Sequence, residues 1–160
     1  MADVLIRKAT TADAGEISGV LIRSITELCT ADHQDDPDLI EGWLANKSPD
    51  HIREWIEAGA QMQVSQFGDA IGAVGCFSNE GMIQLLYVAP EARGQGHSSA
   101  LLSQMEQELR ELGVETANLV SSKTAQDYYL KQGWQIEGER VACYTTDGQP
   151  MRKQLIPTQN

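Results

Sequence analysis

A glycine-rich turn between a strand-like run and a helix-like run is the feature that most constrains the fold of this chain. The stretch YVAPEARGQGHSSALL, residues 87–102, contains an apolar run that stops at a proline, then the turn, then a helical pattern. A turn of this kind presents free backbone N–H groups at the positive end of a helix dipole. The stretch therefore predicts an anion-binding site where a strand passes into a helix.

The first third of the chain predicts one strand followed by three short helices. The run DVLIRKA, residues 3–9, reads as a strand, and the TTAD after it fits a capping box with Thr10 at the N-cap and Asp13 reaching back. Pro37 and Pro49 each fit the first turn of a further helix, where the fixed φ of proline is suitable. Apolar residues recur at helical spacing in all three segments: Ile17, Val20, Leu21, Ile25 and Leu28, then Leu39, Ile40, Trp43 and Leu44, then Ile52, Trp55 and Ile56.

The middle of the chain predicts an antiparallel meander of three strands ahead of the glycine turn. The expected strands are Met62–Phe67, Ala70–Phe77 and Met82–Val88, and the intervening GD and SNEG are hairpin-turn signals. After the turn, Ser98–Leu112 carries an apolar stripe at helical spacing that ends at Gly113.

The last third predicts a strand, a helix and a final hairpin. VETANLVS, residues 114–121, is strand-like, and TAQDYYLKQGW, residues 124–134, is a short helix that ends at Gly133. We expect Asp147-Gly148 to form a hairpin turn between two last strands. Because no linker or repeat interrupts this order, it predicts a single α+β (mixed α/β) domain over residues 1–160.

Two common phosphate-binding turns fit the glycine turn poorly. A P-loop needs a lysine after its last glycine, but His97 follows Gly96. A Rossmann fingerprint is one step away from residues 94–99, and Glu115 lies about 20 residues on, as a ribose-binding acid should. However, Glu115 would begin a strand rather than end one, and the turn follows a meander rather than repeated βαβ units.

A third interpretation makes the arginine part of the motif. Arg93–Ser98 reads RGQGHS, which resembles the [Q/R]-x-x-G-x-[G/A] pyrophosphate loop of the GCN5-related N-acetyltransferases, the GNAT family. LLYVAP, residues 85–90, resembles the fourth strand of that family, and YYLKQGW, residues 128–134, resembles its late helix. The resemblance covers nearly the whole chain. It implies the GNAT acyltransferase fold, a central, mostly antiparallel sheet flanked by helices.

The resemblance implies that the loop binds the pyrophosphate of acetyl-CoA, the acetyl donor. Gly94 and Gly96 would let the backbone approach the phosphates closely, and the N–H groups of the loop would donate to them. A lysine is not needed, because no phosphate is transferred. Ser98 stands where the family usually has Gly or Ala, and it is small enough for close approach. The residues expected to bind the coenzyme here are Arg93, Gly94, Gln95, Gly96, His97 and Ser98.

Residues outside the loop complete the site that the resemblance implies. Leu86, Tyr87 and Val88 correspond to the strand whose backbone groups bind the pantetheine arm and the acetyl carbonyl. Tyr129 corresponds to the tyrosine beside the coenzyme sulfur, where a phenol can protonate the leaving thiolate. Its spacing to Gly133-Trp134 selects it over Tyr128, although packing alone could also explain it. Ser122 stands where many relatives have an asparagine that contacts the pantetheine arm.

The general base is not identified by the sequence. Gln84 stands on the expected fourth strand where many relatives carry a glutamate, and Glu80 precedes that strand in a turn that we expect to be exposed. Water, or an acid from the segment ADHQDDPD, residues 31–38, could serve instead. His33, Asp35 and Asp36 lie in that segment, which we interpret first as a solvated helix cap. For His97, a surface or packing role is favoured over a catalytic one.

Composition excludes several other classes of protein. With a net charge of −11 the chain is a poor partner for nucleic acid. No apolar run approaches the roughly 20 residues that cross a bilayer, so no membrane partner is expected. The N-terminal MADVLIRKATTADAGEI meets charges within a few residues and does not resemble a signal peptide. We therefore expect a cytoplasmic protein.

The cysteines and histidines predict neither a metal site nor a disulfide. Cys29, Cys76 and Cys143 are far apart and lack metal-binding spacing. The three histidines, His33, His51 and His97, form no cluster in the sequence. The cysteines are therefore interpreted as packing residues in a reducing compartment.

Taken with the resemblance, these patterns predict an acetyl-CoA-dependent N-acetyltransferase that acts by direct transfer in a ternary complex. The acceptor would be a small-molecule amine or a peptide amine, and the sequence does not identify it. The alternative is a GNAT-fold module that binds acetyl-CoA as a sensor or regulator without transferring the acetyl group. A homodimer is one possible assembly.

Overall fold

Two antiparallel sheets form the framework of the protein. The computed structural model describes residues 4–143 and 146–157. The first sheet has the order β1 (Leu5–Lys8), β2 (Gln61–Phe67), β3 (Ala70–Phe77) and β4 (Ile83–Val88). The second has the order β5 (Thr116–Ser121), β8 (Thr146–Gln154) and β6 (Gln135–Ile136), and β7 (Val141–Cys143) also pairs with β8. The predicted meander is confirmed as β2, β3 and β4, with every pair antiparallel.

Six α-helices and two short 3₁₀ helices connect these strands in the described residues. The α-helices are α1 (Ala14–Leu28), α2 (Thr30–His33), α3 (Pro37–Leu44), α4 (Pro49–Glu57), α5 (His97–Glu111) and α6 (Lys123–Lys131), and the 3₁₀ helices are η1 (Thr11–Asp13) and η2 (Pro90–Ala92). The capping box at Thr10 and Asp13 is present, and prolines begin α3 and α4 as predicted. The single-turn α2 was not predicted, because four residues are too few to show a periodicity.

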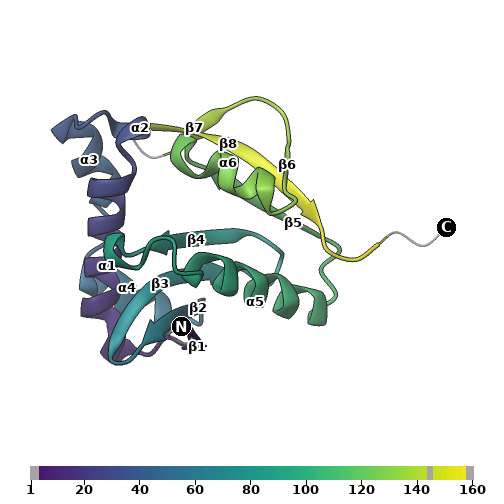
Figure 1. Ribbon diagram of the computed structural model, residues 1–160, viewed down its shortest axis with the longest axis horizontal. Helices are drawn as coiled ribbons and strands as arrows, with labels where there is room; N and C mark the ends of the chain where they lie inside the picture. Colours follow the sequence, from purple (N-terminus) through teal and green to yellow (C-terminus); the bar gives the residue numbers. More distant parts are fainter. Residues whose placement is uncertain (1–3, 144–145, 158–160) are drawn as a thin grey trace.

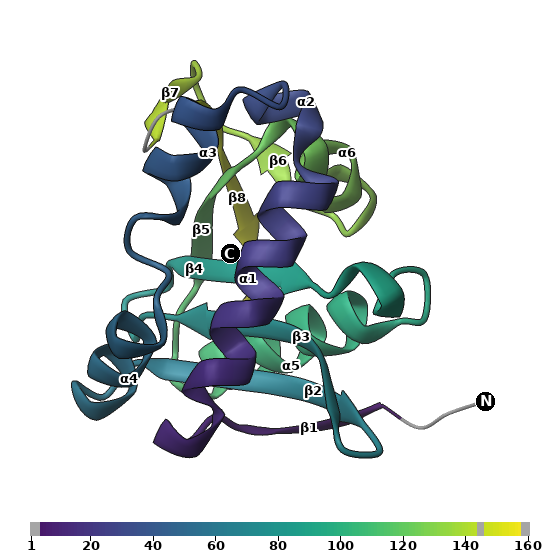
Figure 2. The same ribbon diagram turned by 90° about the vertical axis from the view of Figure 1, so that its left-hand side faces the viewer.

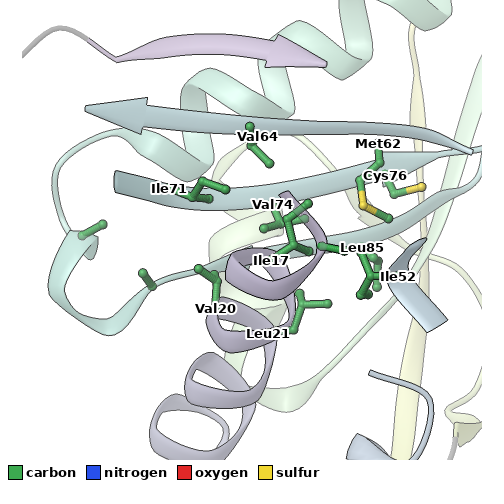
Figure 3. Close-up of a cluster of buried hydrophobic side chains, with 13 residues drawn as sticks. Ile17, Val20, Leu21, Ile52, Met62, Val64, Ile71, Val74, Cys76 and Leu85 are labelled. Atoms are coloured by element: carbon green, nitrogen blue, oxygen red, sulfur yellow. The ribbon is translucent and has the colours of Figure 1, made fainter. Parts of the chain in front are cut away.

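One hydrophobic core lies between the first sheet and the helices α1 and α4. Figure 2 shows α1 crossing in front of strands β1–β4, with α5 behind them. Side chains from α1, α4 and the three meander strands meet in this core, and Figure 3 shows Ile17 of α1 beside Val74 of β3. The labelled members are Ile17, Val20, Leu21, Ile52, Met62, Val64, Ile71, Val74, Cys76 and Leu85.

A second core lies on the other face of the first sheet, where α5 packs against β3. A Cβ built on Gly75 would lie 2.8 Å from Met105 Cε, and one on Gly72 would lie 2.5 Å from His97 Nδ1. Glycine at these two positions therefore lets α5 approach the sheet closely. This core continues through Trp134 and Met151 into the second sheet.

The two sheets meet at one end and separate at the other. Met82 and Asn118 form a parallel bridge, and the Asn118 N–H donates to Gly81 O at 2.8 Å. Beyond this bridge β4 and β5 have no pairing and belong to different sheets, and Figure 1 shows them diverging. β4 is therefore an edge strand whose outer row of backbone N–H and C=O groups has no strand partner.

Helix α5 is also tied to the second sheet by a buried carboxylate. Glu106 accepts hydrogen bonds from Lys153 Nζ at 2.8 Å and from Trp134 Nε1 at 3.2 Å. Glu106 and Trp134 are both buried. Trp134 is the third residue after the end of α6, so this network holds the end of α6 against α5 and β8.

The predicted hairpin turn at Asp147-Gly148 is wrong. Both residues lie inside β8, where Asp147 pairs with Ala142 and Gly148 pairs with Val141. The chain therefore has three last strands in place of the two expected. The Asp-Gly signal is overridden by pairing with β7 and by an ion pair from Arg140 to Asp147 Oδ1 at 2.8 Å. Residues 144–145, which connect β7 to β8, lie outside the described part.

Candidate functional site

The glycine turn borders a cleft of about 420 Å³ between the end of β4, the start of α5 and α6. We call it the loop cleft. The structure brings together here all the predicted site residues except Gln95. The cleft is lined by Leu86, Tyr87, Val88, Arg93, Gly94, Gly96, His97, Ser98, Ser122 and Tyr129, and also by Ser24, Leu28, Cys29, Ala92, Ser99, Thr124, Ala125 and Tyr128.

The backbone of the turn is arranged to receive an anion. Gly94 and Gly96 have φ values of 81° and 87°, which favour glycine, and a Cβ on either would meet no protein atom within 4 Å. The N–H groups of Gly94, Gly96, Ser98 and Ser99 make no hydrogen bond to another described residue. These donors lie at the positive end of the 15-residue helix α5.

Two polar side chains of the turn behave differently. Arg93 lines the cleft and is exposed, and its side chain makes no hydrogen bond or ion pair within the described residues, so its charge is available to a ligand. Gln95 does not line the cleft, because its side chain donates to Glu91 O at 3.1 Å. Gln95 can contribute to a ligand only through its backbone.

His97 is a packing residue, as its sequence context favoured. Its side chain is buried against the first sheet, where Nδ1 lies 2.8 Å from Ser65 Oγ and the ring covers Gly72. Burial lowers the pKa of His97 below its ordinary value. A neutral ring held under the sheet leaves only the backbone of His97, at the first position of α5, to face the cleft.

Tyr129 is better placed than Tyr128 to reach a ligand near the middle of β4. Tyr129 is buried between the rings of Tyr128 and Trp134, at centroid distances of 5.6 and 6.0 Å. Its hydroxyl makes no hydrogen bond to a described residue, whereas the Tyr128 hydroxyl lies 3.0 Å from Ser99 Oγ. Burial raises the pKa of Tyr129 well above 10, so the phenol keeps its proton at neutral pH.

Helix α6 begins with two caps, one local and one distant. Ser122 Oγ accepts from the Ala125 N–H at 3.2 Å, which leaves the Ser122 hydroxyl hydrogen to donate elsewhere. Asp32 of α2 accepts from the Lys123 N–H at 2.7 Å, and from the N–H and hydroxyl of Thr124 at 3.2 and 2.7 Å. The segment before α3 therefore holds one wall of the loop cleft in place.

The acidic segment at 31–38 holds structure together, and none of its carboxylates, Asp35 included, lines the loop cleft or either of the two cavities described below. His33 is buried, with Nδ1 accepting from the Asp35 N–H at 3.0 Å and Nε2 lying 2.9 Å from Ile25 O. Asp36 caps α3 by accepting from the Asp38 N–H at 2.9 Å. The helix-cap interpretation is confirmed for Asp36, but His33 is buried and not solvated.

A small cavity of about 90 Å³ lies between β4 and β5, where the two sheets separate. We call it the junction cavity. It shares Leu86, Tyr87, Ser122, Ala125 and Tyr129 with the loop cleft. Its other lining residues are Trp43, Ile83, Gln84, Leu85, Leu119, Val120, Ser121, Thr146, Asp147 and Gly148.

An outer cavity of about 630 Å³ lies on the far side of the junction cavity, between the end of α4 and the start of β4. The two share Ile83, Gln84, Leu85 and Val120. Gln84 is exposed and accepts a hydrogen bond from Cys76 Sγ at 3.4 Å. Glu80 is exposed, as expected, and lines none of the three cavities.

Several site features were not predicted from the sequence. The loop cleft is also lined by Thr124 and by the end of α1, and its wall at α6 is held by Asp32. No local sequence pattern predicts that these residues belong to the site. Asp147 was missed because its Asp-Gly pair was interpreted as a turn. Within the described ranges, no group of three or more His, Cys, Asp or Glu residues could hold a metal ion, and no helix there is long and apolar enough to cross a membrane.

Comparison with known proteins identifies the family. The model of the acetyltransferase (GNAT) domain matches residues 29–155, which is most of the chain. The chain belongs to the GNAT acetyltransferase family. The family and the fold expected from the glycine turn, the strand before it and the late helix are thus confirmed. No curated protein matches this chain.

Solved GNAT structures share the fold at low sequence identity. A GCN5-related N-acetyltransferase (aminotransferase, class II) from Rhodopseudomonas palustris has a TM-score of 0.86 at 18% identity, over 96% of this chain and 97% of its own. PaiA N-acetyltransferase from Thermoplasma acidophilum, solved with coenzyme A, has a TM-score of 0.79 at 16% identity, over 95% and 99%. The putative acetyltransferase YncA from Salmonella typhimurium, solved with acetyl-CoA, has a TM-score of 0.66 at 20% identity, over 99% and 98%.

Proposed function

We propose that this GNAT protein transfers the acetyl group of acetyl-CoA to an amine by direct attack in a ternary complex. The observation that carries the proposal is the junction cavity, which shares Tyr129 and four other lining residues with the loop cleft and shares four different lining residues with the outer cavity. A thioester entering from one side and an amine entering from the other would meet there. Two reactants held in contact gain a large effective concentration.

The loop cleft suits the coenzyme. The four unpaired N–H groups and the open space over Gly94 and Gly96 would receive the pyrophosphate, with Arg93 adding positive charge. The outer edge of β4 at Leu86–Val88, where β4 and β5 belong to different sheets, would hold the pantetheine arm, and the Ser122 hydroxyl can donate to it. Similar structures that contain coenzyme A and acetyl-CoA support this assignment.

In the proposed reaction the amine nitrogen attacks the acetyl carbon, so that a C–N bond forms and the C–S bond breaks. Backbone N–H groups of β4 would stabilise the negative charge that develops on the carbonyl oxygen. The Tyr129 hydroxyl would give its proton to the departing sulfur, the nitrogen would lose its proton to water, and water would return a proton to the Tyr129 phenolate. Water is assigned this role because Gln84 cannot serve as a base, and because Asp147, the only carboxylate among the described residues that line the junction cavity, has a pKa lowered by its hydrogen bond from Arg140.

The direct test is release of free thiol from acetyl-CoA across a panel of amines, polyamines, amino acids and peptides. Acceptor-dependent release, with an acetylated product of matching mass, is the expected result. If coenzyme A binds but no acceptor gives release, the proposal is overturned. That outcome would favour the alternative function, a sensor or regulatory module that binds acetyl-CoA without transferring it.

A further inference from the structure

The outer cavity is unusual in its lack of charge. The chain has 23 acidic and 12 basic residues, yet no charged side chain is among the described residues that line this cavity. Its walls include Trp55, Phe77, Met82 and Val120, with amide and hydroxyl groups between them. Burying a charged group among such side chains is costly, whereas burying an apolar group is favourable. The cavity therefore suits an uncharged, largely apolar group.

The junction cavity, in contrast, carries one negative charge. Asp147 is the only carboxylate among the described residues that line it. Its Oδ1 accepts from Arg140 Nη2 at 2.8 Å, and Arg140 also donates to Gln126 Oε1 at 3.1 Å, which orients the pair. The hydrogen bond from Arg140 lowers the pKa of Asp147, so the carboxylate stays ionised and is a weak proton acceptor. Only Oδ1 is engaged by Arg140, so Oδ2, which accepts no hydrogen bond from another described residue, is suited to binding a second cation.

A second feature of the junction cavity indicates that it receives a polar ligand atom. Trp43 lines it and is 4% exposed, yet its Nε1–H has no hydrogen-bond partner among the described residues. An unpaired buried donor costs about 1–3 kcal/mol. The carbonyl oxygen of the acetyl group, or an amine nitrogen that has lost its proton, could accept from this N–H and would remove that cost, which a dry structural void would not.

We propose that the acceptor is a monoamine with an uncharged, largely apolar body. The body occupies the outer cavity, and Asp147 receives the ammonium group at the junction cavity before the nitrogen loses its proton and attacks. Asp147 therefore binds and positions the acceptor. It does not act as a base, and it does not replace the glutamate that many relatives carry on β4. This inference rests on the proposed function, since the junction cavity must be the place where acetyl transfer occurs.

The first experiment compares acceptors by kcat/KM in the thiol-release assay. The expected order places 2-phenylethylamine and hexylamine above spermidine and kanamycin by at least about tenfold, or about 1.4 kcal/mol. Transfer to the polycations but not to the monoamines would overturn the inference while leaving the acetyltransferase function intact. Binding of 2-phenylethylamine to the coenzyme A complex, measured by calorimetry, tests the same point without turnover.

The second experiment uses Asp147→Asn. Loss of a charge-assisted hydrogen bond should raise the KM of the monoamine about 10–100-fold and leave the KM of acetyl-CoA unchanged. The matched control is Asp50→Asn, which breaks an ion pair with Arg53 of similar length, 2.7 Å, on α4, away from the three cavities. Equal KM values for the two variants would exclude Asp147 from acceptor binding.

A third variant keeps the inference testable if Asp147→Asn fails to fold. Met82 is 40% exposed and lines the outer cavity, so Met82→Glu can be made without burying a charge in the core. The new carboxylate should lower kcat/KM for 2-phenylethylamine and raise the relative rate with diamines. An unchanged preference would show that the acceptor body does not occupy the outer cavity.

Discussion

The Tyr129 hydroxyl is the single group on which turnover is expected to depend most. We predict that Tyr129→Phe lowers kcat by about 10²–10⁴-fold, the usual contribution of a positioned acid, with little change in acetyl-CoA affinity. The ring between Tyr128 and Trp134 remains, so the packing persists. The measurement is steady-state kinetics together with coenzyme binding.

Tyr128→Phe is the matched control, because that hydroxyl is already engaged with Ser99. It should stay near wild type. If both variants lose activity equally, or if only Tyr128→Phe does, the assignment of the acid is wrong. If neither matters in an active enzyme, water protonates the thiolate and Tyr129 only packs.

The unpaired Nε1–H of Trp43 gives a prediction with opposite effects on stability and activity. Replacing the indole N–H with sulfur, by incorporating 3-benzothienylalanine at position 43, keeps the shape but removes the donor. The free energy of unfolding of the ligand-free protein should stay the same or rise, because a buried unsatisfied donor is lost. In the same variant kcat/KM should fall about 2–10-fold, the value of one hydrogen bond.

The same replacement at Trp134 is the control, since that Nε1–H donates to buried Glu106 at 3.2 Å. There the free energy of unfolding should fall by about 1–3 kcal/mol. A comparable loss of stability at both positions would show that the Trp43 N–H has a partner in the folded protein.

At the scale of elements, the position of α6 depends on a carboxylate 91 residues away in sequence. Asp32 uses both oxygens to accept from the first turn of α6. Asp32→Asn would turn an N–H₂ group toward one of those donors and would remove a charge that favours the helix N-terminus. We predict a loss of about 2 kcal/mol, or roughly 4–8 °C in Tm, and a raised KM for acetyl-CoA.

The comparison variant is Asp36→Asn, in which a local cap on exposed α3 is replaced by an equally good capping residue. It should change Tm by less than about 1 °C. The measurements are the Tm and the KM for acetyl-CoA of both variants. Equal Tm values would mean that the link from α2 to α6 contributes little.

For the whole molecule, coenzyme binding should appear as added stability. At a concentration about 100-fold above its Kd, coenzyme A should stabilise the fold by roughly 2.7 kcal/mol, a Tm increase of roughly 5–10 °C. The motivation is the set of unpaired donors in the glycine turn. No shift with millimolar coenzyme A would contradict the assignment of the loop cleft.

Two glycine variants separate backbone strain from ligand contact. Gly96 and Gly113 lie at opposite ends of α5, have φ values of 87° and 83°, and face open space. Gly96→Val and Gly113→Val should therefore both lower Tm through strain. Only Gly96→Val should also abolish the shift with coenzyme A, because only its side chain would occupy the loop cleft.

The sequence by itself determined the local elements and the family. Helical and strand periodicities, the Thr10 capping box, the prolines that begin α3 and α4, and the glycine turn are all properties of neighbouring residues. Their physical causes, backbone sterics and capping hydrogen bonds, act over a few residues. The order of strands in the meander followed from its short turns. These predictions could be made without knowing how distant segments pack.

Only the tertiary structure decided which distant residues meet. His97 packs under the sheet because Gly72, on another element, leaves room for its ring. Asp32 caps α6, and Asp147 pairs with β7 in place of forming a turn. The junction cavity exists because β4 and β5 separate beyond Met82 and Asn118. Strand register and the angle between sheets result from packing of the whole core, so no local pattern in the sequence encodes them.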